Sequence, residues 1–144
     1  MKSLAKLKKI KGDASFREFY RNKENKSIIV ISKKEKLKNL LIYDAINKIL
    51  IKNKILAPTL LSENYINNYI EINDFVDQTL FQILKNKKNN KYAYFKKIIK
   101  ILNKIQLIKD KKVKNFKNKL YKVKEYNNKI LFDETKLFSD WYAP

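Results

Sequence analysis

The spacing of apolar and polar positions predicts two early strands followed by a long helix. Large and charged residues alternate in "SFREFYR" (15–21), which is typical of a strand. "SIIVIS" (27–32) is β-branched and apolar on both faces, as expected for a buried strand. The polar turn "NKENK" between them favours a hairpin. Apolar residues then recur at helical spacing over about 34–53, which predicts a long helix.

The rest of the chain gives shorter predicted elements. Residues 1–11 have apolar positions at helical spacing and favour a short amphipathic helix. Pro58 ends the long helix, and strands are expected near 59–62 and over 67–73. Helices are expected over 79–85 and 92–108, whereas the charge-rich stretch 109–129 is ambiguous. This order predicts an α+β fold, in which a small antiparallel sheet has one helix packed against it and helical material follows.

Composition narrows the chemistry that the chain can perform. Its 144 residues are enough for one compact domain, and they include neither cysteine nor histidine. Disulfides, thiolate nucleophiles, Ser-His-Asp catalysis and most zinc sites are therefore excluded. No apolar run approaches the ~20 residues of a membrane span, and the basic N-terminus lacks the apolar region of a signal peptide. We therefore expect a cytoplasmic protein without membrane contact.

The net charge of +20 comes almost entirely from lysine. Asparagine and isoleucine are also abundant, while arginine, glycine and proline are scarce, which indicates codons drawn toward adenine and thymine. Such a bias raises lysine content without regard to partners. Proteins that read nucleic acid specifically tend to use arginine instead. Binding of RNA or another polyanion therefore stays open as the less favoured alternative.

Four segments occur in order along nearly the whole chain: "GDASFREFYR" (12–21), "ILAP" (55–58), "NDFVDQTL" (73–80) and "LFDETKLFSDWY" (131–142). Together they resemble the aminoglycoside phosphotransferase-type small-molecule kinases, and most of all their cell-wall amino sugar kinase branch. Two positions depart from the family, since Asn73 stands for its glutamate and Val76 for its hinge glycine. The resemblance implies a protein-kinase-like small lobe over 1–80. It implies a helical extension over 81–144, the start of an incomplete second lobe, with the catalytic lobe missing.

The resemblance also implies ATP as cofactor and a set of nucleotide-binding residues. The only glycine of the chain, Gly12, would lie in a turn over the triphosphate, because glycine lets backbone N–H groups approach phosphate oxygens closely. The alternative for Gly12 is a plain turn that enters a hairpin. The nucleotide-binding residues are expected to be Gly12, Asp13, Ala14, Ser15, Arg17, Lys33, Asn73, Asp74 and Phe75.

These residues divide into a phosphate end and an adenine end. Arg17 and Arg21 lie four residues apart on one strand and so share a face, which either reaches phosphates or is simply solvated. Lys33 or Lys34 would follow the central strand, as a phosphate-binding kinase lysine does. Backbone groups around 72–75 would read adenine.

Several acidic and aromatic residues have a structural explanation as well. Asp44 is either the partner of the kinase lysine or, more simply, a surface acid. Asp74 and Asp77 are interpreted as turn-forming residues. The aromatic residues at the end of the chain are of a type most often found in a core. In a complete kinase they would pack against the second lobe, and without that lobe they would be exposed. They are Phe132, Phe138, Trp141 and Tyr142.

Two classes of function follow. One is an ATP-dependent phosphotransferase for a small hydroxylated substrate, present as a nucleotide-binding portion that is inactive alone, or as half of a split kinase that needs a partner chain. The other is a basic RNA- or polyanion-binding module. No catalytic or metal-binding residue is predicted, and Mg²⁺ is expected only if a catalytic lobe is supplied. The C-terminal aromatic residues also predict self-association that depends on salt.

Overall fold

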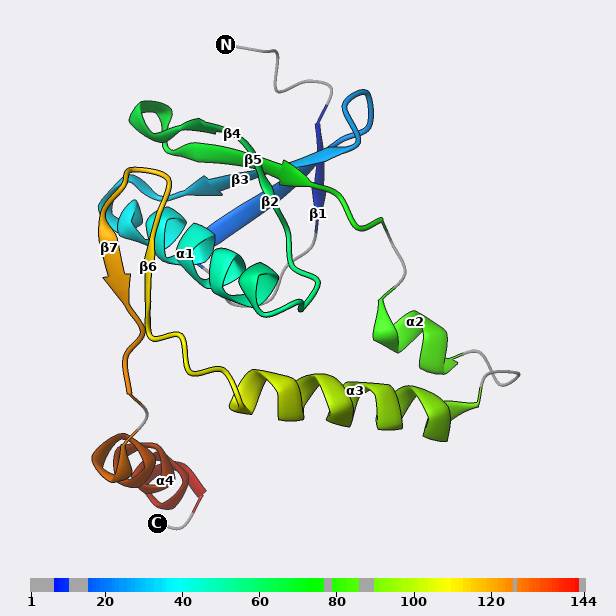
Figure 1. Ribbon diagram of the computed structural model, residues 1–144, viewed down its shortest axis with the longest axis vertical. Helices are drawn as coiled ribbons and strands as arrows, with labels where there is room; N and C mark the ends of the chain where they lie inside the picture. The colour runs from blue at the N-terminus through cyan, green and yellow to red at the C-terminus, as the bar shows by residue number, and fades with distance from the viewer. Residues whose placement is uncertain (1–6, 11–15, 77–78, 86–89, 126, 143–144) are drawn as a thin grey trace.

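The computed structural model describes residues 7–10, 16–76, 79–85, 90–125 and 127–142. Five antiparallel strands form one sheet in the spatial order β1-β2-β3-β5-β4 (Figure 1). The strands are β1 (Lys8–Ile10), β2 (Arg17–Asn22), β3 (Ser27–Ser32), β4 (Leu60–Asn64) and β5 (Tyr69–Asn73). Together with the helices described below, this sheet confirms the predicted α+β class and its antiparallel sheet.

The predicted hairpin forms between β2 and β3. Arg17 lies opposite Ser32 and Phe19 lies opposite Val30 in its register. β3 also pairs with β5, so it is the central strand that its continuous apolar sequence predicts. Val30 and its neighbour on β5, Ile70, are fully buried and form the centre of the core.

The N-terminal segment corrects one prediction. Lys8–Ile10 form strand β1 rather than part of a helix, and they pair with β2 from Lys8↔Arg21 to Ile10↔Phe19. The free edge of β2 offers backbone groups that need partners, and satisfying them outweighs the weak helical pattern of a few apolar positions. The remainder of the predicted helix, residues 1–6, lies outside the described residues.

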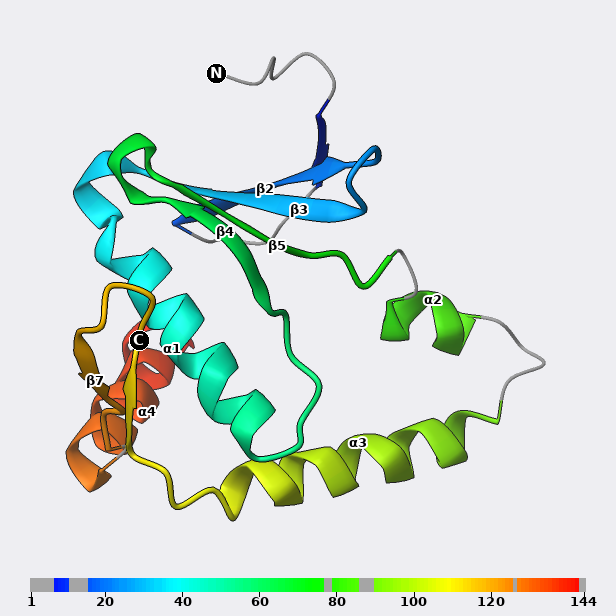
Figure 2. The same ribbon diagram turned by 45° about the horizontal axis from the view of Figure 1, so that its top comes forward.

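The long helix is confirmed as α1 (Lys38–Lys52), preceded by a 3₁₀ helix at Lys34–Lys36. It lies along one face of the sheet (Figure 2). Leu40 of α1 is fully buried and packs with Val30 and Ile70. The sheet and α1 are thus two packed layers with the core between them.

The second half of the chain is less purely helical than predicted. It contains α2 (Leu80–Lys85), α3 (Lys91–Gln106) and α4 (Asn128–Tyr142). Between α3 and α4, the ambiguous stretch forms a hairpin of β6 (Lys112–Lys114) and β7 (Leu120–Lys122). The hairpin turn includes Asn118, whose positive φ of 55° suits an asparagine.

This hairpin returns to α1 and β4. The Phe116 N–H donates to the Asp44 carboxylate at 2.7 Å, and the Phe116 ring packs edge-on against Tyr65 at 5.8 Å. Lys117 pairs with Glu63 at 2.7 Å. Residues on both sides of α1 therefore hold it in place, with the sheet on one side and the hairpin on the other.

The aromatic side chains described for α4 are exposed, as expected for them without a second lobe. Phe132, Trp141 and Tyr142 are 70% or more exposed, so they do not belong to a core within this chain. The side chain of Phe138 lies outside the described residues. No helix among the described residues is long and apolar enough to cross a membrane.

Candidate functional site

The inner face of β2 and the adjacent face of α1 form a corner that contains polar side chains. Arg17, Phe19 and Arg21 alternate along β2, so all three side chains lie on the α1 side of the sheet. The Arg17 guanidinium lies 4.8 Å from the centre of the Tyr43 ring, a cation–π distance. Phe19 contacts the same ring edge-on at 6.4 Å. The prediction that the two arginines share a face is confirmed, and that face is half-buried rather than fully solvated.

Two side chains of α1 complete this corner. Tyr43 and Asn47 lie one turn apart on the same side of the helix. Burial raises the pKa of the Tyr43 hydroxyl, while the neighbouring Asn47 side chain and the charge of Arg17 act to lower it. The phenol therefore stays protonated at neutral pH. Asn47 is 7% exposed, and its side-chain nitrogen has no hydrogen-bond partner among the described residues. The Asn47 amide nitrogen is itself buried, so it is a polar group enclosed in the packing of α1.

The exit of β5 forms the other end of the candidate site. Asn73 accepts hydrogen bonds from the Thr59 N–H at 2.6 Å and the Thr59 hydroxyl at 3.1 Å, so it fixes the chain that enters β4. Asp74 accepts from Arg21 Nε at 2.5 Å and from Arg21 Nη2 at 3.1 Å. These side chains are 6% and 13% exposed, respectively. The Arg21–Asp74 pair therefore joins β2 directly to the segment that follows β5.

The backbone of this exit has few free donors. The Asn73 N–H donates to Thr59 O, and the Asp74 N–H donates to Lys26 O. The Val76 N–H donates to the Asp74 carboxylate at 2.9 Å, a local turn bond that confirms the turn-forming interpretation of Asp74. Among the described residues, no acceptor lies at the Phe75 N–H. Phe75 is 42% exposed, so this exit is open to solvent at Phe75.

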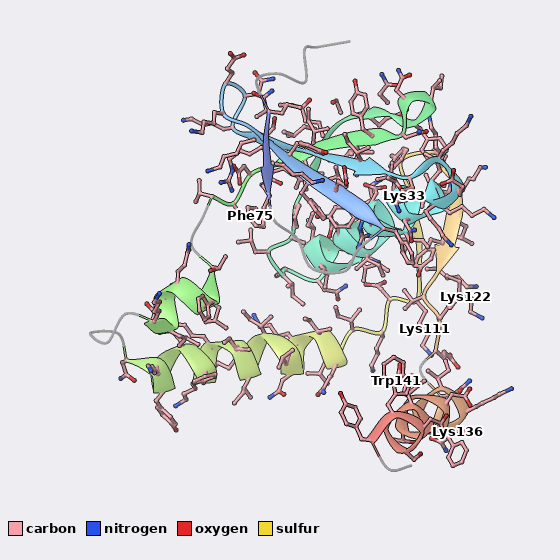
Figure 3. The ribbon with its side chains drawn as sticks, turned by 180° about the vertical axis from the view of Figure 1, so that it is seen from behind. Lys33, Phe75, Lys111, Lys122, Lys136 and Trp141 are labelled. Atoms are coloured by element: carbon pink, nitrogen blue, oxygen red, sulfur yellow. The ribbon has the colours of Figure 1, made fainter. Side chains whose placement is uncertain are left out.

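The residues of the predicted site fall at two ends of the sheet. Lys33 follows Ser32, which lies opposite Arg17, so Lys33 and Arg17 belong to the same end. Asn73, Asp74 and Phe75 belong to the opposite end (Figure 3). The six residues of β2 separate these ends by about 16 Å, at about 3.3 Å per residue.

The predicted glycine turn lies outside the described residues. Gly12, Asp13, Ala14 and Ser15 are in this part of the chain, and so is Asp77. The residues that flank the turn are Ile10, opposite Phe19, and Phe16, directly before β2. The segment therefore joins the sheet at the end that holds Arg17 and Lys33.

Asp44 corrects both predictions made for it. It is 4% exposed, so it is not a surface acid. Its carboxylate accepts from the Phe116 N–H, and its cationic neighbour is Lys48 at 2.8 Å rather than Lys33 or Lys34. The physical reason is the return of the hairpin, which covers this side of α1 and needs an acceptor for a backbone N–H. Asp44 is thus a structural residue that fixes the hairpin.

Sequence reasoning missed Tyr43 and Asn47. Both occur in the predicted helix, where Leu40, Tyr43, Asn47 and Leu50 follow one another at helical spacing. A lone amide in such an apolar series is a signal of a buried polar group. This signal would have identified the side of α1 that holds Tyr43 and Asn47 as one with polar groups in the core.

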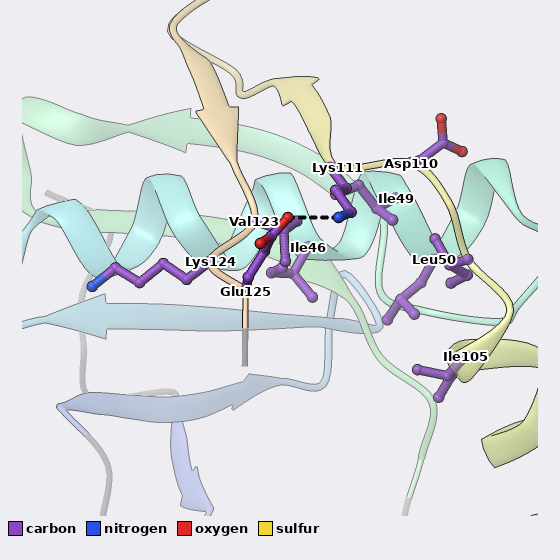
Figure 4. A pocket seen from close by; sticks show the side chains of 10 residues that line it. Ile46, Ile49, Leu50, Ile105, Asp110, Lys111, Val123, Lys124 and Glu125 are labelled. Atoms are coloured by element: carbon purple, nitrogen blue, oxygen red, sulfur yellow. Dashed lines mark hydrogen bonds and ion pairs between the residues drawn. The ribbon is translucent and has the colours of Figure 1, made fainter. Parts of the chain in front are cut away.

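A second concave feature lies between α1, the end of α3 and the segment that follows β7 (Figure 4). This groove has a volume of about 490 Å³ and mostly aliphatic walls, including Ile46, Ile49 and Ile105. Both carboxylates of its rim are paired, because Lys111 binds Glu125 at 2.6 Å and Lys52 binds Asp110 at 2.6 Å, and Lys124 also lines the groove. These hydrogen bonds lower the pKa of both carboxyl groups. The groove therefore suits apolar side chains better than a phosphorylated ligand.

The chain matches no protein-family model and no curated protein in comparisons with known proteins. Across the part of the chain that the structure describes, no group of three or more acidic residues could hold a metal ion.

Proposed function

We propose that this chain is the nucleotide-binding lobe of a small-molecule kinase of the aminoglycoside phosphotransferase type. ATP lies in the corner between β2 and α1. Its phosphates are at the end that holds Arg17 and Lys33, and its adenine is at the exit of β5. An extended nucleoside triphosphate has a length comparable to the separation of these ends.

The arrangement of sheet and helix supports this proposal. A five-stranded antiparallel sheet with a helix between its third and fourth strands is the architecture implied for a kinase small lobe. The two arginines of β2 lie on the same face as α1, which is the face that would look onto bound nucleotide. A charged hydrogen-bond donor on this face is suited to phosphate recognition.

The observation that carries the proposal is the backbone of Val76. Its φ is 60°, a left-handed conformation that glycine adopts without steric cost and that a β-branched residue avoids. Val76 stands where the resembled kinases have their hinge glycine. Five non-glycine residues among those described have positive φ, and Val76 is the β-branched one of them. A left-handed backbone at the position of the family's hinge glycine supports the resemblance despite the substitution.

Each residue of the site has a role in this proposal. Arg17 and Lys33 neutralise phosphate charge. The Phe75 N–H and the carbonyl groups of Asn73 and Asp74 read the edge of adenine.

The proposed activity of residues 1–144 alone is binding without efficient phosphoryl transfer. In the resembled family, the catalytic base and the metal-binding residues come from a region that follows the motif at 131–142. Mg²⁺ and turnover therefore need groups beyond those that the resemblance assigns to these residues. Loss of such groups generally costs phosphotransferases orders of magnitude in rate.

Isothermal titration calorimetry with ATP tests the proposal. We expect saturable binding of one ATP per chain, weakened roughly tenfold or more by Arg17→Met, because a hydrogen bond to a charged group contributes about 1.5–3 kcal/mol. Lys114→Met is the matched control, since Lys114 is an exposed lysine on the hairpin. Circular dichroism checks that both variants fold. Equal weakening by both substitutions, or an absence of saturation, would contradict a specific nucleotide site.

A further inference from the structure

We propose that α3 and α4 form a reciprocal interface between two copies of this chain, in which α3 of each copy lies against α4 of the other. This inference does not depend on the nucleotide site, because neither helix contributes to the corner between β2 and α1.

The apolar side of α3 is exposed. Its side chains at 92, 95, 99 and 102 recur at three- and four-residue intervals and so lie on one side of the helix. They are Tyr92, Phe95, Ile99 and Leu102, each between 49% and 76% exposed. No residue of this 16-residue helix is buried. At its C-terminal end the exposed side meets the groove through Ile105.

The apolar side of α4 is exposed to a similar degree. Leu131, Leu137, Trp141 and Tyr142 are between 44% and 78% exposed. Large contiguous apolar surfaces are rare on monomers and are usually interaction sites. Two exposed amphipathic helices in one chain therefore call for a covering partner.

The charges of the two helices are complementary. α3 has five lysines and no acidic residue, and these are Lys91, Lys96, Lys97, Lys100 and Lys104. α4 has three acidic residues, Asp133, Glu134 and Asp140, against two lysines. It is thus the one net-negative helix among those described, in a chain whose net charge is +20. The acidic and aromatic helix α4 of a second copy is therefore a suitable partner for α3, which is apolar with lysines at its borders.

A second copy fits better than the same copy because the connection between the helices is fixed. The segment between α3 and α4 is anchored on α1 through the Asp44–Phe116 hydrogen bond and the Lys52–Asp110 pair. Both helices lie on the side of α1 away from the sheet (Figures 1 and 2), and Trp141 projects from α4 (Figure 3). A twofold axis pairs each α3 with the partner's α4 and covers both apolar sides at once.

The area is sufficient for a stable dimer. In each copy, four aromatic side chains would bury on the order of 100 Å² each, and four aliphatic side chains would add a similar total. The surface buried in the interface would then be roughly 800 Å² per copy. That is the size of a standard protein–protein interface. Repulsion between two basic chains opposes association, but salt screens it beyond about 8 Å at physiological ionic strength.

Charge reversal tests the proposal through two variants. The first is Lys96→Glu, Lys100→Glu on α3, and the second is Asp133→Lys, Asp140→Lys on α4. Each variant alone places like charges across both α3–α4 contacts. We expect sedimentation equilibrium to show a dimer for the unmodified chain and at least roughly thirtyfold weaker dimerisation for each variant.

An equimolar mixture of the two variants is the decisive measurement. In the heterodimer, opposite charges face each other at both contacts, and the total charge equals that of the unmodified dimer. We therefore expect the mixture to regain dimerisation. A mixture that stays monomeric would overturn the proposal, because it would mean that α4 covers its own α3 or that another protein covers both. An unmodified chain that is monomeric at every concentration would overturn it as well.

A control variant separates local from general charge effects. Lys23→Glu, Lys119→Glu makes the same charge change as the α3 variant, but at exposed positions on the β2–β3 turn and on the β6–β7 hairpin. It should dimerise at least as strongly as the unmodified chain. Equal weakening in this control would assign the effect to net charge and refute the interface.

Discussion

Replacement of Arg21 by methionine should destabilise the protein by about 3 kcal/mol. The guanidinium makes two hydrogen bonds to Asp74, and the two side chains are 13% and 6% exposed. Breaking a buried pair by removing one partner costs about 3–5 kcal/mol, because it leaves a buried charge without compensation. Asp74 keeps its bond from the Val76 N–H, so we expect the lower end of that range.

A double-mutant cycle isolates the pair itself. Asp74→Asn retains the volume and an acceptor, so it should cost about 1–2 kcal/mol. The double variant Arg21→Met, Asp74→Asn should cost less than the sum of the single variants, with a coupling energy of about 1–3 kcal/mol. Urea unfolding followed by circular dichroism measures all four free energies.

The exposed Lys9–Glu18 pair provides a matched control. Its atoms are 2.9 Å apart and its side chains are 59% and 49% exposed, so Lys9→Met should cost less than about 0.5 kcal/mol. If Arg21→Met costs no more than Lys9→Met, or if the coupling energy is near zero, solvent screens the buried pair. The inference that it holds the exit of β5 to β2 would then be wrong.

Three further predictions concern the hinge and the hairpin. Val76→Gly should raise the free energy of unfolding by about 0.5–1 kcal/mol. The steric energy that valine costs in the left-handed conformation exceeds the extra conformational entropy of glycine in the unfolded chain. A loss of stability in urea unfolding would contradict the backbone assigned to Val76. Asp44→Ala should speed hydrogen exchange of the Phe116 amide roughly tenfold or more while the amides of β3 stay protected, and uniform exchange across both would refute the anchoring role of Asp44. Acid should release the hairpin before the sheet. Hydrogen bonds from lysine lower the folded-state pKa values of three carboxyl groups that hold or border the hairpin, against one on the β1–β2 side of the sheet, Glu18. The stabilisation from these groups is complete above the unfolded pKa values and is lost as the pH falls through the folded ones. Hydrogen exchange between about pH 5 and pH 3 tests this, and simultaneous loss of both elements would count against it. The three groups are Glu63, Asp110 and Glu125.

The sequence predicted the elements whose stability is local and missed those that depend on distant partners. Alternation in 15–21 and β-branched residues in 27–32 predicted β2 and β3, because both signals act within one strand. β1 has three residues, and its pairing depends on the open edge of β2. The β6–β7 hairpin is covered with lysine, so only Val113 and Tyr121 mark its half-buried side.

The candidate site shows the same division. Asp74 could be interpreted as a turn residue because the bond to the Val76 N–H is local. Its pairing with Arg21 spans 53 residues, and the hydrogen bond from Phe116 to Asp44 spans 72, so no short pattern could predict either. Burial of Asp44 follows from that distant contact, which is why a surface position was expected.

Nuclear magnetic resonance of the ¹⁵N-labelled chain, titrated with ATP at constant ionic strength, tests the proposed nucleotide site most directly. The account predicts saturable shifts concentrated at the Phe75 backbone amide and the Arg17 Nε–H. ADP should reproduce the shift at Phe75, whereas inorganic triphosphate should shift Arg17 and leave Phe75 unchanged, because it has no adenine. Shifts spread over the lysines of α3, produced equally by ATP, triphosphate and RNA, would contradict a nucleotide site and would favour a general polyanion-binding protein.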